Sequence, residues 1–131
     1  MTALLACAAV SVAALGQGAP RSTKDGVYAR DQATRGGKQY AQVCASCHDP
    51  ARIPEGKKAG PPLVGDKFLD KWRDRTLGEL LTTIETTMPN DGSAVLTSEE
   101  TADVVAYVLQ ANGFPAGSKA LSGKDKDVVI K

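Results

Sequence analysis

CASCH, the stretch from Cys44 to His48, decides what this 131-residue chain folds around. Its spacing is C-x-x-C-H, the attachment pattern of a c-type haem. Two thiols on one helical turn can both reach vinyl groups at one edge of a porphyrin, and the adjacent imidazole can then ligate the iron. The sequence therefore predicts one covalent haem c, bound by Cys44 and Cys47, with His48 as an iron ligand.

Other roles for the two cysteines need partners that the sequence lacks. A zinc site needs further ligands, but the third cysteine is Cys7 and His48 is the one histidine. A thioredoxin-like redox pair accompanies a βαβ pattern, which is not seen here. A disulfide across so short a loop is strained. Haem attachment is the interpretation that uses the whole motif.

The distal side of the iron needs a second ligand, and Met88 is the candidate. It is the one methionine besides Met1, and no second histidine exists. A thioether is a soft, neutral ligand that raises the haem potential. The alternative is that Met88 continues the apolar helical stripe of residues 77–84 as ordinary core. Because Pro89 stops the helix here, we predict Met88 on the loop leaving it, ligating iron.

Helix signals dominate the chain and predict an all-α fold. A helical pattern covers residues 31–44, a short one covers residues 67–73, and the Pro- and Gly-rich residues 49–66 predict a loop. Gly36 and Gly37 lie within the first helix, where they cost stability, so we expect a close packing contact there.

Two further helices have marked starts. Thr76 with Glu79, and Thr97 with Glu100, have the form of capping boxes. The first of these helices is expected to end near Met88 and the second at about residue 113. No strand-like alternation of useful length and no internal repeat is present.

The chain divides into four expected parts: a signal peptide (1–19), a linker (20–30), a haem domain (31–115) and a C-terminal tail (116–131). Residues 119–131 are expected to be loose, although Val128 to Ile130 could pack. The apolar run 3–15 is too short to span a bilayer and matches a secretory signal, which predicts an exported, periplasmic protein. No Lys or Arg precedes the run, so we expect the true start upstream.

Cys7 lies inside that apolar run. Leu4 to Cys7 resembles a bacterial lipoprotein box, in which an acylated cysteine would anchor the protein to a membrane. Too few residues precede it to form a signal, so this alternative requires a longer N-terminus. We expect Cys7 to be removed with the signal, and membrane anchoring only if it is lipidated.

The charge is distributed unevenly along the sequence. The net charge of +1 gives no reason to expect a nucleic-acid partner, but residues 20–75 hold 12 Lys/Arg against 7 Asp/Glu, and residues 76–118 hold six acids and no base. One interpretation is an ordinary solvated surface. The other is a dipolar molecule that orients itself toward a redox partner.

Taken in order, the motifs resemble the class I c-type cytochromes, the monohaem mitochondrial and bacterial type, over about residues 33–113. Gly36, Tyr40 and CASCH match the N-terminal helix and haem site of that family. Residues 103–108 are similar to its C-terminal helix, whose aromatic residue crosses near the N-terminal glycine.

Two loops carry the resemblance further. Residues 60–63 resemble the loop in which a proline carbonyl, here Pro61, accepts the Nδ1–H of the proximal histidine, and in which Leu63 packs on the haem. Residues 87–89 resemble the loop that carries the distal ligand, Met88. The resemblance implies a cytochrome c fold, with three to five helices wrapped around one haem.

The function implied is electron transfer rather than catalysis. A carrier would move single electrons between redox proteins, with a dehydrogenase or reductase as donor and an oxidase or another cytochrome as acceptor, and would be a monomer or a subunit of a complex. The alternative is a tightly bound haem c subunit of a periplasmic dehydrogenase or oxidase complex. A haem enzyme or gas sensor with an open iron site would need a distal acid–base group, and no second histidine is available.

Overall fold

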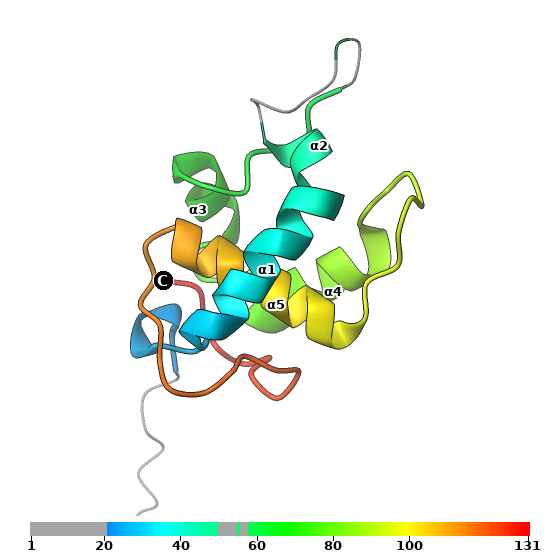
Figure 1. The fold of residues 1–131 in the computed structure, drawn as a ribbon. Helices are drawn as coiled ribbons and strands as arrows, with labels where there is room; N and C mark the ends of the chain where they lie inside the picture. Colours follow the sequence, from blue (N-terminus) through cyan, green and yellow to red (C-terminus); the bar gives the residue numbers. More distant parts are fainter. Residues whose placement is uncertain (1–20, 50–54, 56–57) are drawn as a thin grey trace, which may run out of the picture.

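The computed structural model describes residues 21–49, 55 and 58–131 (Figure 1). The predictions made for residues 1–19, including Cys7, lie outside this part. Within it the chain forms helices and no strand, which confirms the all-α class. The elements are a 3-10 turn, η1 (Thr23–Asp25), and the helices α1 (Arg30–Val43), α2 (Ala45–His48), α3 (Asp66–Trp72), α4 (Leu77–Thr87) and α5 (Ser98–Ala111).

α1 packs across α5 at the centre of the molecule (Figure 1). A Cβ atom on Gly36 would lie 1.7 Å from the backbone oxygen of Asp103, so only glycine permits this approach. The Tyr107 ring lies over Gly37, and the Arg35 guanidinium donates to both carboxylate oxygens of Asp103 at 2.9 and 3.1 Å. The close contact expected at the two glycines is confirmed.

Both predicted capping boxes are present. Thr76 Oγ1 accepts from the Glu79 amide at 3.2 Å, and Thr97 Oγ1 accepts from the Glu100 amide at 3.2 Å. Each glutamate in turn accepts from the amide of its threonine. These caps satisfy amides that have no partner inside the helix. They fix where α4 begins, and α4 ends by delivering Met88 into extended backbone.

The segment predicted as a linker is packed over its described residues, 21–30. The prediction that residues 119–131 are loose was wrong, whereas the expectation that Val128 to Ile130 could pack is confirmed by the burial of Val128 and Ile130. Between residues 21 and 30, the side chains of Thr23, Val27 and Tyr28 are buried. Residues 117–131, which we call the C-terminal strap, bury their own apolar side chains, Leu121, Val128 and Ile130.

The strap is held because it satisfies backbone groups that would otherwise be unpaired. The amides of Leu77 and Gly78, at the start of α4, donate to the carbonyls of Val128 and Lys126 at 2.8 and 3.0 Å. The Thr23 amide donates to Val129 O at 2.9 Å. A buried Gln32 side chain also bonds both backbone groups of Leu121, which ties α1 to the strap.

No described helix has both the length and the apolar character that crossing a membrane requires.

Candidate haem site

The CASCH motif lies on a turn that prolongs α1. The Cys44 amide donates to Tyr40 O and ends α1, and the His48 amide donates to Cys44 O and closes α2, both at 2.9 Å. This turn leaves Cys44 half-buried and Cys47 exposed, and neither is in a disulfide. The two thiols therefore lie three residues apart on a helical turn.

The imidazole of His48 is fixed by the loop that follows. Nδ1 lies 2.7 Å from Pro61 O. A carbonyl oxygen can only accept, so Nδ1 carries the proton and the lone pair of Nε2 is left for a metal ion. The Gly60 amide donates to Cys47 O at 2.8 Å, and a Cβ on Gly60 would lie 2.8 Å from His48 Cε1. Gly60 thus lets the loop close against the ring.

A cavity of about 340 Å³ opens beside this turn. All six residues singled out from the sequence line this cavity. The lining residues predicted from sequence are Cys44, Cys47, His48, Pro61, Leu63 and Met88. Further apolar walls come from α1, α4, α5 and the 89–97 loop, through Val43, Ile84, Leu96 and Val104.

Met88 lies at the exit of α4. Its amide makes the last helical hydrogen bond, to Ile84 O at 3.0 Å. The side chain is half-buried and faces the cavity, whereas Leu77, Leu80 and Leu81 of the same stripe are buried in the core. The position on a loop leaving the helix is as predicted, and it differs from that of an ordinary core residue.

These side chains fit a c-type haem. Two thiols, an imidazole nitrogen and a thioether sulfur surround a mostly apolar cavity, and these are the attachment and ligand groups that such a haem uses. Within the described residues no group of three or more His, Cys, Asp and Glu side chains could hold a metal ion by itself. The ligand set therefore does not suit a zinc site there.

The ionisation of Cys44 separates the site from a thiol-redox pair. Burial, helped by the neighbouring Cys47, raises the pKa of the Cys44 thiol to about 11. Redox-active C-x-x-C pairs have lowered thiol pKa values, because the thiolate is the nucleophile. At neutral pH Cys44 is a thiol, which argues against the thioredoxin-like alternative.

Sequence reasoning missed Asn112. Its side chain donates to Leu63 O at 2.9 Å and accepts from the Gly65 amide at 2.9 Å, so it fastens the Leu63 loop to the end of α5. An Asn before Gly113 indicates a helix end. Nothing in the sequence connects it with a loop some fifty positions earlier.

A helical domain with C-x-x-C-H on a turn, its histidine bonded to a proline carbonyl and a methionine in the same cavity, has the features of a c-type cytochrome domain. The family model described as "Cytochrome C oxidase, cbb3-type, subunit III" matches residues 31–108. The chain belongs to this family. It is a c-type cytochrome that binds covalent haem c with its iron, and its role is electron transfer.

Comparison with curated proteins gave no match, and comparison with solved structures gave none either.

Proposed function

We propose that this chain is an exported, periplasmic cytochrome that passes single electrons between redox proteins through a haem held by Cys44 and Cys47 and ligated by His48 and Met88. The observation that carries the proposal is the 2.7 Å hydrogen bond from His48 Nδ1 to Pro61 O, beside a cavity that Met88 also lines.

Each residue has a separate task. The thiols of Cys44 and Cys47 would hold the haem covalently. The Pro61 carbonyl fixes the tautomer of His48 and increases its electron donation to the iron. Met88 supplies a neutral, soft sulfur, which favours the reduced iron. A bound haem would supply the one-electron chemistry, and His48 and Met88 would be the ligands that this chain offers its iron.

Electron exchange requires brief contact with a partner near the haem. Val64 and Val95 are the exposed large apolar side chains of the described residues, with 47% and 93% of their surfaces accessible. Val64 follows Leu63 and Val95 precedes Leu96, and both leucines line the cavity. Exposed apolar groups next to cavity-lining residues suit the small, short-lived contacts of redox encounters with a donor dehydrogenase or reductase and an acceptor oxidase or cytochrome.

Export is inferred from the apolar run at residues 3–15, which has the length and composition of a secretory signal. The mass of the mature protein tests this inference. A mature N-terminus near residue 20 supports export and loss of Cys7. An added lipid mass on Cys7 would instead indicate a membrane-anchored lipoprotein, and a chain retaining residues 1–19 unmodified would contradict both.

A second candidate is a haem subunit that stays bound in a larger complex. The matching family is described as an oxidase subunit, which favours this second candidate. Persistence of the complex at high salt would support this function. A free monomer that reduces several unrelated acceptors would support the diffusing carrier.

Met88→Leu tests the proposed ligation, because it removes the sulfur but keeps the apolar volume. We expect the sulfur-to-iron absorption band to disappear and the haem potential to fall. Ile84→Ala is the matched control: it removes packing from the same cavity and should retain the band. A band that survives Met88→Leu, or that is lost equally in Ile84→Ala, would contradict the assignment.

A further inference from the structure

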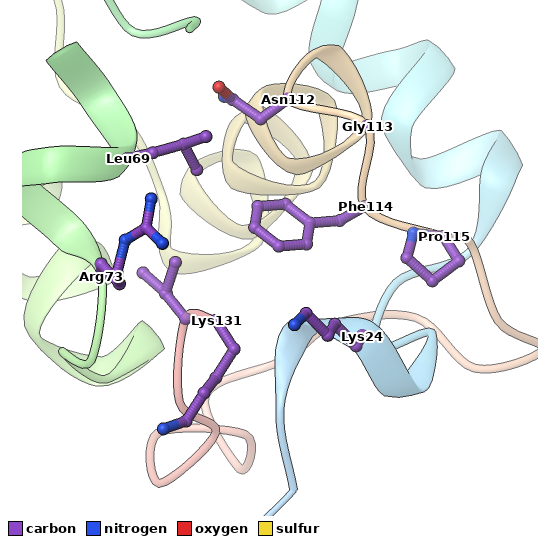
Figure 2. A pocket seen from close by; sticks show the side chains of 9 residues that line it. Lys24, Leu69, Arg73, Asn112, Gly113, Phe114, Pro115 and Lys131 are labelled. Carbon is purple, nitrogen blue, oxygen red and sulfur yellow. The ribbon is translucent and has the colours of Figure 1, made fainter. Parts of the chain in front are cut away.

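A second cavity, also of about 340 Å³, lies on another part of the molecule and shares no lining residue with the haem site (Figure 2). Four separate segments meet around it: η1, α3, the end of α5 and the end of the strap. The lining residues are Lys24, Leu69, Arg73, Asn112, Gly113, Phe114, Pro115, Ile130 and Lys131.

The walls of this cavity are fixed by hydrogen bonds. The Phe114 amide donates to Leu109 O at 3.1 Å, and the Tyr28 hydroxyl donates to Phe114 O at 2.6 Å. On the opposite wall the Asp74 amide donates to Ile130 O at 2.8 Å. The cavity is therefore formed before anything enters it, which lowers the cost of binding.

The cavity has an apolar wall and a cationic rim. Figure 2 shows the Phe114 ring facing the space between Leu69, Arg73 and Lys24. Phe114 and Leu69 are partly buried against the core, and Ile130 is fully buried. The described residues that line the cavity include three cations and no acid.

Two of those cations are available to a ligand. Lys131 Nζ is held by Asp74 Oδ1 at 2.8 Å. Lys24 and Arg73 are exposed, and within the described part of the chain their side chains make no hydrogen bond or ion pair. Arg73 offers a planar fork of donors that matches a carboxylate.

We propose that this cavity binds a small organic acid, one carboxylate carried on an aromatic or branched apolar body. The carboxylate would lie between Lys24 and Arg73, and the body would cover Phe114 and Leu69. Cavities of this size and composition hold small molecules, in which an apolar body gives affinity and a few polar contacts fix orientation. An inorganic anion would leave the apolar wall uncovered.

4-Phenylbutyrate is the probe we would use, titrated into the reduced holoprotein and followed by amide NMR. We expect saturable shifts at the Gly113 and Phe114 amides. Removal of either cation, in Lys24→Ala or Arg73→Ala, should weaken binding about tenfold, because a charge-assisted hydrogen bond is lost. Lys38→Ala is the matched control, an exposed lysine on α1 outside the cavity, and should bind the probe as the parent does.

Asp74→Asn gives a test in the opposite direction. Asp74 has φ of 63°, a conformation that asparagine tolerates, so the variant keeps the backbone while it removes the negative charge and releases Lys131. We expect tighter binding of the probe.

Three outcomes would overturn the proposal. The first is the absence of saturable shifts at the Gly113 and Phe114 amides. The second is equal binding of 4-phenylbutylamine, which has the same apolar body and the opposite charge. The third is equal binding of acetate, which has the carboxylate but lacks the apolar body. The haem spectrum and the unfolding temperature of each variant show that it is folded.

Discussion

The haem end and the strap end of this molecule are held together in different ways. At the haem end, the α2 turn, the Pro61 loop and the exit of α4 meet around a cavity, and two hydrogen bonds, His48 to Pro61 O and Gly60 to Cys47 O, join the turn to the loop. At the strap end, two terminal segments close on α4 through backbone hydrogen bonds and buried side chains. The haem end is built around a cavity for a cofactor, whereas the strap end is held by its own hydrogen bonds and packing.

The two ends should therefore respond to different changes. A change at the strap end should lower stability and leave the haem electronically unaltered. A change beside His48 should alter the haem and cost less stability. Only a change at the crossing of α1 and α5, which joins the two ends, should alter both the stability and the haem.

Gly36→Val should have the largest effect, because the added atoms overlap the Asp103 carbonyl and force α1 away from α5. We expect a loss of more than about 4 kcal/mol in unfolding free energy, at the extreme of single substitutions, together with a disturbed haem spectrum. Denaturant unfolding followed by visible absorption measures both. Gly37→Ala is the control, since its Cβ meets only the Tyr107 ring, which can shift. Equal losses of unfolding free energy in the two variants would contradict the idea that overlap with the Asp103 carbonyl is the cause.

Ile130→Ala should break the strap end alone. Ile130 is fully buried, and truncating such a side chain costs about 2–5 kcal/mol. We expect lower stability in denaturant with an unchanged haem potential and spectrum. A shifted potential would show that the two ends are coupled. Val129→Ala, at a less buried neighbour, should cost less.

Gly60→Ala should break the haem end alone. The new methyl group would lie 2.8–2.9 Å from two atoms of the His48 ring and would push it from Pro61 O. Weaker electron donation from the imidazole should raise the haem potential, while overpacking costs about 1–3 kcal/mol. Electrochemistry checks the first and denaturation the second. Gly65→Ala is a control without a neighbour within 4 Å, and its positive φ should affect stability alone.

Glu79→Gln should have the smallest effect, and one that depends on pH. Hydrogen bonding from Thr76, and then from Arg75, lowers the pKa of Glu79 below its ordinary value of 4.5. A lowered folded-state pKa gives stability that is present above pH 4.5 and lost as pH falls through the folded-state value. The difference in melting temperature between Glu79→Gln and the parent should therefore shrink on acidification. Glu85→Gln, an exposed glutamate of α4 outside the capping box, is the matched control.

The same two ends differ in how far the sequence predicts them. At the haem end the signals are local, since neighbouring residues contain the whole pattern. These signals are the CASCH motif, the Thr76 and Thr97 caps and the helix end at Met88–Pro89. They predicted the helices and the six residues around the haem cavity. The roles of those six residues in holding and ligating haem stay predictions, which the substitutions at Met88 and Gly60 address.

The sequence indicated only that Val128 to Ile130 could pack, and the rest of the strap was expected to be loose because its apolar residues have no helical or strand period. Leu121, Val128 and Ile130 stand among charged residues and glycine, which is typical of a flexible tail. Their burial depends on partners elsewhere, such as the open amides at the start of α4. Asn112 was missed for the same reason, because its loop partners are distant in sequence.

The strap also sets an order of events during synthesis. Ribosomes release a chain from its N-terminus, so Cys44 and Cys47 emerge before the residues of α4 and α5. The amides of Thr23 and Leu77 find their acceptors only in Val129 and Val128. These hydrogen bonds therefore form only after Val128 and Val129 have been synthesised.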